Sequence, residues 1–176
     1  MREVPATIQG ISKHSVASIC AVTTGEGVYG IDTREVREVL GESQIRQVPL
    51  APWFIAGVMP YRGEVLAAVS LRAVLGLEPS AERTCVLVLE DDDRGRHFGL
   101  IVDAVGGVVA VPEEGLQSNP TTLDARRSAL FAGVWQTETG LLVKLEPARL
   151  RPSRLAAGGL NGSNTSMERL EARCER

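Results

Sequence analysis

Short apolar segments separated by turn-forming residues recur along this chain, and this pattern constrains its fold more than any other feature. The segment 84–89, Thr-Cys-Val-Leu-Val-Leu, is rich in β-branched side chains, as a buried strand is. Gly25-Glu26-Gly27 and the charged stretch 90–96 are turn signals between such segments. Many short strands joined by turns predict an all-β sandwich or barrel. We expect strands at 16–22, 28–32, 65–71, 84–89, 97–102, 105–111, 131–135 and 141–145.

Three segments do not follow this pattern. Val36, Val39 and Leu40 have helical spacing behind Asp32 and Glu35, which are placed like a capping box, so periodicity alone predicts a helix over 33–40. The segment 71–77 predicts one or two helical turns that end at Gly76. From residue 152 onward the composition is that of a flexible linker, Ala-Ala-Gly-Gly followed by Asn-Gly-Ser-Asn-Thr-Ser. We expect a flexible tail over 152–176, because a charged helix at 167–176 is too short to be stable alone.

The composition excludes several classes of protein. The chain has 176 residues, a net charge of -3 and 44% hydrophobic residues, which suits one domain or two small packed ones. It lacks the positive field that binding to the phosphates of nucleic acid requires. It also has no apolar run of about 20 residues and no signal peptide, so we expect a cytoplasmic protein without direct membrane insertion. Three cysteines and two histidines, all widely spaced, predict reduced thiols and no zinc site.

Two strings resemble catalytic or metal-binding motifs without their context. The segment 25–30 matches Gly-x-Gly-x-x-Gly, but a strand rather than a helix follows it, so we interpret it as a hairpin turn. The acidic run 91–93 lacks the alternating ligands and distant Glu of a calcium loop and is typical of a solvated hairpin tip. No nucleophile is paired with a recognisable base. We therefore expect no enzyme activity and no catalytic, cofactor-binding or metal-binding residues.

The segment 49–72 carries the most information about function. Pro49 and Pro52 stiffen a connection that leads to the bulky apolar string Trp53-Phe54-Ile55, which a core or a partner must cover. Arg62 stands among apolar residues, where burial would require an anionic partner.

In this segment and in several others, the chain resembles the CheW-like chemotaxis coupling proteins. That family has the patterns Tyr-Gly-Ile-Asp, Val-x-Glu-Ile, Ile-Pro-x-Ala-Pro-x-Phe-Ile-x-Gly-Val, Asn-Leu-Arg-Gly, Asp-Leu-Arg and Gly-hydrophobic-Val-Asp-x-Val, in this order. The matching segments here are 29–32 (Tyr-Gly-Ile-Asp), 36–39 (Val-Arg-Glu-Val), 48–58, Arg62-Gly63, 99–105 and 141–146. The sequence departs from the family at Pro60-Tyr61, which replace Asn-Leu, at Ser70, which replaces Asp, and at Gly106-Gly107, which replace Ser followed by an acidic residue.

The resemblance implies a mainly β fold of two packed five-stranded SH3-like β-barrel subdomains with a shared apolar seam. Ten strands result only if 36–40 and 57–62 are strands, so the resemblance overrides the helical periodicity of 33–40. A short C-terminal helix is expected near 147–150. The resulting organisation is an N-terminal extension at 1–14, a CheW-like domain at 15–151 and the flexible tail at 152–176.

The resemblance also implies a function. It predicts a non-enzymatic adaptor that couples chemoreceptors to a CheA-type histidine kinase, cytoplasmic and recruited to membrane-associated receptor arrays. The expected partners are the regulatory domain of that kinase and the cytoplasmic tip of the receptor, held in a groove between the barrels. Two alternatives stay open: a CheW-like adaptor of a pilus-motility or gene-regulatory chemosensory system, and a β-barrel that binds a small molecule or catalyses a reaction.

The matching positions predict which residues would serve these partners. We expect Arg62 and Glu38 to pair across neighbouring strands, beside or within the receptor site. On the kinase side we expect apolar residues of the first barrel, namely Val28, Ile31 and Val39. The residues implied to line or support the receptor groove are Val36, Glu38, Gly57, Arg62, Gly63, Gly99, Val105 and Val108.

Overall fold

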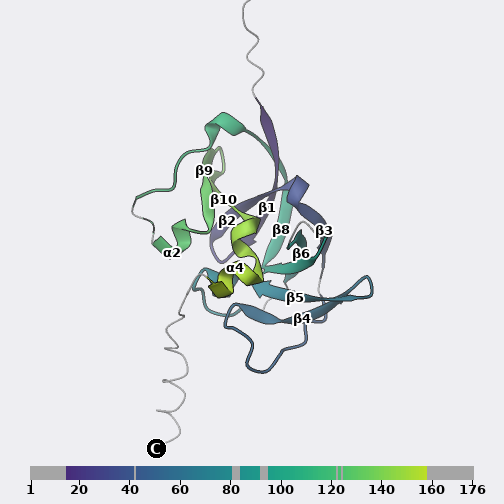
Figure 1. The fold of residues 1–176 in the computed structure, drawn as a ribbon. Helices are drawn as coiled ribbons and strands as arrows, with labels where there is room; N and C mark the ends of the chain where they lie inside the picture. Colours follow the sequence, from purple (N-terminus) through teal and green to yellow (C-terminus); the bar gives the residue numbers. More distant parts are fainter. Residues whose placement is uncertain are drawn as a thin grey trace, which may run out of the picture.

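Ten strands form two five-stranded sheets in the computed structural model, which describes residues 15–41, 43–80, 84–91, 95–121, 123 and 125–157 (Figure 1). The first sheet, called the first barrel, has the order β8 (Ala104–Pro112), β1 (Val16–Thr24), β2 (Gly27–Asp32), β10 (Gly140–Leu145) and β9 (Phe131–Thr137). The second sheet, called the second barrel, has the order β3 (Val36–Leu40), β6 (Cys85–Glu90), β7 (His97–Val102), β5 (Glu64–Ser70) and β4 (Ile55–Tyr61). The mainly β fold with two five-stranded units is therefore confirmed.

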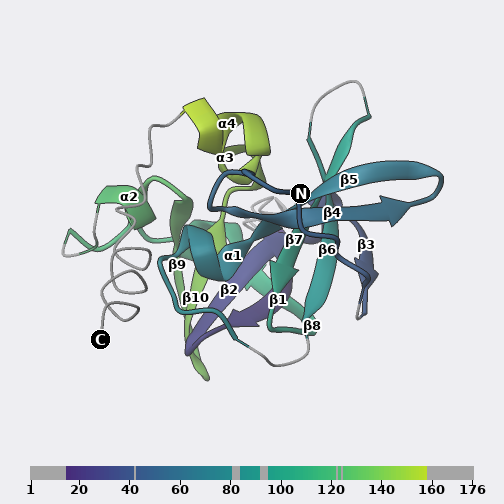
Figure 2. The same cartoon turned by 90° about the horizontal axis from the view of Figure 1, so that it is seen from below.

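The chain crosses between the two barrels at two points. It leaves the first barrel after β2, through a short 3-10 helix at Thr33–Glu35, and builds the whole second barrel from β3 to β7. It returns at Asp103, the single residue between the end of β7 and the start of β8. Figure 2 shows the two sheets side by side, with α1 (Leu71–Val74) near their junction.

Three apolar clusters hold this arrangement together, and strand alternation explains how they arise. Successive side chains of a strand point to opposite faces. In β6, Val86 and Val88 therefore fill the interior of the second barrel, while Leu87 and Leu89 point the other way, into a larger cluster with residues of the first barrel. The continuous apolar run at 84–89 thus has both of its faces buried.

We call this larger cluster the seam. It joins side chains of β1, β2, β9 and β10 to side chains of β5, β6, β7 and α1, whereas the interior of the first barrel holds a small cluster of its own. The seam residues on the first barrel include Cys20, Val22 and Ile31, and those on the second include Leu87 and Phe98. The expected apolar seam between the barrels is present.

The segment 33–40 is not the helix that its periodicity indicates. Only Thr33–Glu35 are helical, and Asp32 caps this turn by accepting a hydrogen bond from the Arg34 N–H at 2.9 Å. Residues 36–40 form β3, which pairs with β6 along Leu89 to Val86. The burial of its side chains alternates with period two, since Val39 is exposed and its two neighbours are partly buried. Pairing with β6 therefore favours the strand over the helix that the local sequence indicates.

Short helices complete the fold, and one of them corrects an expectation. The helical turn predicted at 71–77 is α1, capped by the Ser70 hydroxyl, and Gly76 follows it with a positive φ of 70°. The helix expected near 147–150 is α3 (Pro147–Leu150). Two helices were not predicted, α2 (Ala125–Ser128) and α4 (Pro152–Ala157).

Helix α4 shows that the flexible tail does not begin at residue 152. Pro152 stands at its first position, and Leu155 is 3% exposed within the seam cluster. Figure 2 shows α3 and α4 together at one end of the two sheets. Burial of Leu155 anchors residues 152–157 to the barrels. The predictions for 1–14 and for the tail from 158 onward lie outside the described residues.

Candidate functional site

Three of the predicted groove residues border the seam where it reaches solvent. Val36 of β3 lies opposite Leu89, Val105 of β8 lies opposite Val22, and Val108 lies opposite Cys20. Directly opposite residues of paired strands project to the same face, and these three opposite residues all belong to the seam.

Val36 and Val105 pack against the seam and are partly buried, while Val108 is 66% exposed. We call Val36, Val105 and Val108 the apolar rim. It takes residues from both barrels, so its shape depends on how the barrels are oriented relative to each other. An exposed valine beside a packed apolar cluster offers a partner an apolar contact next to a firm surface.

The predicted pair of Glu38 and Arg62 forms, but it does not join neighbouring strands. Arg62 Nη2 donates to Glu38 Oε2 at 2.7 Å, and the buried Tyr61 donates its hydroxyl to the same oxygen at 2.8 Å. Glu38 lies on β3 and Arg62 follows β4, which are the two outer strands of the second sheet. The pair therefore links the two ends of this sheet, and the prediction of adjacent strands was wrong.

Hydrogen bonds set the electrostatics of this group. The hydroxyl of Tyr61 and the guanidinium of Arg62 lower the pKa of Glu38, and the Glu38 carboxylate raises the pKa of Tyr61. The Arg62 guanidinium also lies 5.3 Å from the centre of the Tyr61 ring. Because the Arg62 side chain remains 68% exposed, it can meet a partner without leaving Glu38.

The predicted glycines serve the backbone of the second barrel and do not form a common surface. Gly57 is buried, and a Cβ there would overlap the carbonyl oxygen of Arg46, which accepts a hydrogen bond from the Val58 N–H. Gly99 faces the barrel interior, where a Cβ would lie 2.9 Å from Val86. Gly63 has a φ of 87° in the turn after β4 and is exposed. Gly57 and Gly99 can support a binding surface but cannot contact a partner.

The three residues expected on the kinase side do not lie together on the first barrel. Val28 of β2 is 41% exposed and belongs to the first barrel, while Val39 is 44% exposed but belongs to β3 of the second. Ile31 is fully buried in the seam, so its side chain has no surface to offer a partner. Two expectations are therefore corrected: Ile31 is a core residue and not a contact, and Val39 belongs to the second barrel and not to the first.

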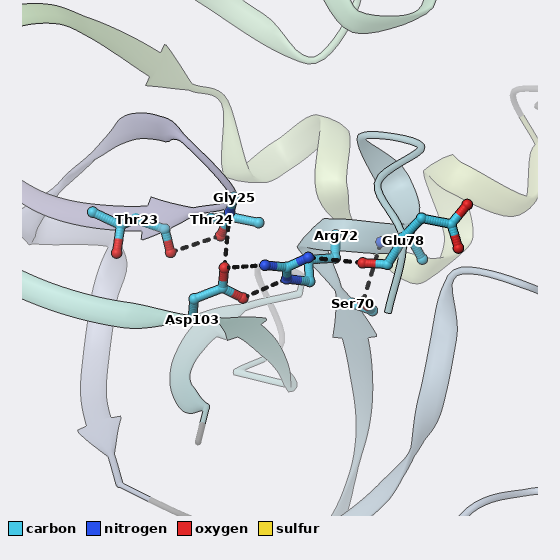
Figure 3. A network of polar contacts seen from close by, with 8 residues as sticks. Thr23, Thr24, Gly25, Ser70, Arg72, Glu78 and Asp103 are labelled. Carbon is cyan, nitrogen blue, oxygen red and sulfur yellow. Dashed lines mark hydrogen bonds and ion pairs between the residues drawn. The ribbon is translucent and has the colours of Figure 1, made fainter. Parts of the chain in front are cut away.

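A polar cluster that the sequence analysis missed lies at the return crossing, and Figure 3 shows it. Arg72 of α1 donates from Nε and Nη2 to the two carboxylate oxygens of Asp103, at 2.7 and 2.8 Å. Asp103 also accepts from the Gly25 N–H at 2.8 Å, and Arg72 Nη1 donates to the Glu78 carbonyl oxygen at 2.7 Å. The Arg72 guanidinium and the Gly25 N–H lower the pKa of Asp103. We call Arg72 and Asp103 the clamp.

The clamp borders a cavity of about 200 Å³, which is a candidate for a small-molecule site. Its charged lining residues are Arg72 and Asp103, which bind each other, and its polar ones include Ser70 and Thr84. Within the described residues, no three His, Cys, Asp or Glu side chains are close enough to hold a metal ion. None of the helices in the part of the chain that the structure describes has the length and apolar character needed to cross a bilayer.

The departures from the family pattern fall at positions that accept them. Ser70 keeps the role of a helix cap, because its hydroxyl accepts from the Ala73 N–H at 3.2 Å. Pro60 lies exposed on the edge strand β4, where a missing N–H is tolerated. Gly106 and Gly107 are exposed on β8, next to the apolar rim.

Comparisons with known proteins agree with this architecture. The family model described as "CheW-like domain" matches residues 18–153. The chain is 30% identical over 151 residues to the chemotaxis protein CheW of Klebsiella aerogenes, which covers 84% of this chain and 90% of that protein. It is 34% identical over 111 residues to protein PilI of Pseudomonas aeruginosa, covering 62% of this chain and 61% of PilI. The crystal structure of the scaffolding protein TtCheW from Thermoanaerobacter tengcongensis matches with a TM-score of 0.69 and 26% identity, over 77% of this chain and 92% of that one.

Proposed function

Because the chain belongs to the CheW-like family, we propose that it is a non-enzymatic adaptor that couples chemoreceptors to a CheA-type histidine kinase. In this role it works in the cytoplasm, at membrane-associated receptor arrays. It binds the regulatory domain of the kinase on one surface and the cytoplasmic tip of the receptor on another.

The apolar rim is the observation that supports a receptor site most strongly. A receptor tip is a helical hairpin, and an amphipathic helix binds by placing its apolar face against an apolar surface between two supports. The rim offers Val36 from one barrel and Val105 and Val108 from the other, above a seam that is already filled. The predicted residues Glu38 and Arg62 add a charged group on the second barrel, with Arg62 exposed.

A filled seam also suits the transmission of a signal. An adaptor passes on a receptor rearrangement only if it moves as a body, since a loosely packed one would absorb the displacement. The two barrels share one apolar cluster and are held by two chain crossings, which favours rigid movement. Val28 and Val39 stay candidates for the kinase surface because their side chains are exposed, although the two residues lie on different barrels.

Control of the kinase by the receptor in a reconstituted system tests this proposal. The assay measures autophosphorylation of the kinase with receptor cytoplasmic fragments on vesicles, with and without the full chain. We expect receptor control of the kinase only when the chain is present. The variant Val108→Glu should lose most of this control, because it places a charge on the rim.

The matched control is Val65→Glu, because Val65 is also an exposed strand valine, at 71%, but lies on β5 outside the rim. It should couple like the wild type. Equal coupling by both variants would show that the rim does not bind the receptor. Absence of any effect of the wild-type chain on receptor control would contradict the adaptor function itself.

A second candidate function keeps the adaptor role but changes the system. The identity of 34% to PilI, a relative that is not called a chemotaxis protein, favours keeping a pilus-motility or gene-regulatory chemosensory system as the alternative. The exposed Gly106-Gly107 pair beside the rim would suit a different receptor. Binding of the full chain to kinase domains from both kinds of system, compared side by side, distinguishes the two.

A further inference from the structure

Each point at which the chain crosses between the barrels carries an aspartate held by an arginine. At the first crossing Asp32 is 6% exposed and binds Arg34, which lies only two residues further along the chain. At the return crossing Asp103 binds Arg72, 31 residues away. The first pair is local and caps a helical turn, whereas the second connects separate elements.

Asp103 joins the two barrels through three different groups. Its carboxylate accepts two hydrogen bonds from Arg72 of the second barrel and one from the Gly25 N–H, in the hairpin between β1 and β2 of the first barrel (Figure 3). Its own N–H donates to the Thr23 carbonyl oxygen at 3.1 Å. The side chains of Arg72 and Asp103 are 23% and 15% exposed, so water competes with these bonds only in part. Two parallel bonds from a guanidinium to a carboxylate fix orientation as well as distance.

The position of Asp103 in the chain ties the apolar rim to the clamp. Only this residue separates β7 of the second barrel from β8 of the first, so there is no loop to absorb a rotation. Val105 and Val108 follow it on β8, whereas Val36 lies on the second barrel. A rotation of the backbone at Asp103 would therefore move two rim residues relative to the third.

We propose that Arg72 and Asp103 are positioning residues that fix the orientation of the two barrels relative to each other and, through it, the shape of the apolar rim. The part of this inference that concerns the rim as a receptor site rests on the proposed function. The clamp itself does not touch the partner. It acts by holding β8 against the hairpin of the first barrel and against α1 of the second.

Residual dipolar couplings of the full chain measure this orientation directly. In the wild type, one alignment tensor should fit the amides of both barrels in the arrangement described above. Arg72→Gln removes the charge and the paired hydrogen bonds, and it should require a different relative orientation or separate tensors for the two barrels. Arg72→Lys, which keeps the charge without the planar fork, should lie between the two.

Arg62→Gln is the matched control, since it breaks an arginine–carboxylate pair that lies entirely within the second barrel. It should leave the orientation as in the wild type. An unchanged orientation in Arg72→Gln would overturn the proposal. If Arg72→Gln does not fold, an unchanged orientation in Arg72→Lys, together with native-like amide exchange along β8, would overturn it equally.

Binding of a receptor-tip fragment to the wild type and to the Arg72 variants separates this inference from the proposed function. We expect Arg72→Gln to bind about 2- to 30-fold more weakly than the wild type, the effect of about 0.5–2 kcal/mol that mutations without ligand contact have on the coupling between sites. A changed orientation with no binding even by the wild type would uphold the clamp and contradict the receptor site. A changed orientation with wild-type affinity would refute the link between the clamp and the rim.

Discussion

Replacing Ile31 by alanine tests whether this residue belongs to the seam or to a partner surface. Ile31 is fully buried among apolar residues of both barrels. Truncation of a fully buried isoleucine to alanine costs about 2–5 kcal/mol, because the lost transfer free energy is joined by the cost of the cavity. This is a large share of the roughly 5–15 kcal/mol that stabilises a typical domain.

The assay is urea unfolding of the full chain followed by circular dichroism and tryptophan fluorescence. With an m-value of about 2 kcal/mol/M, a loss of about 3 kcal/mol lowers the midpoint by about 1.5 M. Val28→Ala is the matched control on the same strand, and because Val28 is 41% exposed its midpoint should change little.

Binding to the kinase should respond in the opposite way, because Val28 is the exposed candidate of the two: Val28→Ala should be the variant that binds the kinase regulatory domain more weakly. At low temperature, where both variants are folded, Ile31→Ala should bind the kinase regulatory domain like the wild type. An unchanged unfolding midpoint together with weakened kinase binding in Ile31→Ala would refute the assignment of Ile31 to the seam and restore it as a contact.

Three further predictions follow from the packing and the charges. Gly57→Ala should lower the unfolding midpoint by the equivalent of more than about 1 kcal/mol, because its Cβ would overlap a backbone carbonyl, whereas Gly107→Ala, with open space around it, should be neutral or slightly stabilising in the same urea titration. The pKa of Asp103 is lowered in the folded state, so its contribution to stability is complete above the unfolded value of about 3.9 and is lost as the pH falls through the lower folded pKa. Urea midpoints measured from pH 7 to pH 2 should therefore fall less steeply for Asp103→Asn than for the wild type, and parallel curves would contradict this. Reversing the charge of either Glu38 or Arg62 should lower coupling in the kinase assay while circular dichroism stays native, and reversing both should restore part of it; loss of the fold in both single variants would instead support a purely structural pair.

The strands were predictable because their burial follows from local sequence. The run at 84–89 is apolar at every position because one face of β6 fills the second barrel and the other fills the seam. The segment 33–40 was misleading because a segment this short can match both the helical and the strand periodicity. Val36, Val39 and Leu40 fit a helical face, but pairing of β3 with β6 outweighs that weak local preference.

Helix α4 and the clamp were not predictable for two different reasons. Residues 152–157 have the small residues of a linker, and only Leu155 after Pro152 hints that the segment packs. Arg72 and Asp103 match positions of the family patterns Asp-Leu-Arg and Gly-hydrophobic-Val-Asp-x-Val, but nothing in one sequence shows that residues 31 apart meet. The same limit applies to Ile31, since a strand residue in an apolar stretch is equally compatible with a partner surface and with a core.

A chain that couples a receptor to a kinase must bind both, and calorimetric titration of the purified full chain measures this binding without an intermediate assay. The first titrant is the regulatory domain of the CheA-type kinase from the same organism, and the second is a receptor-tip fragment added to the resulting complex. We expect micromolar binding of both, with the second binding to the complex as well as to the free chain. Binding of neither titrant by a chain with native circular dichroism would contradict the adaptor function and leave only the fold.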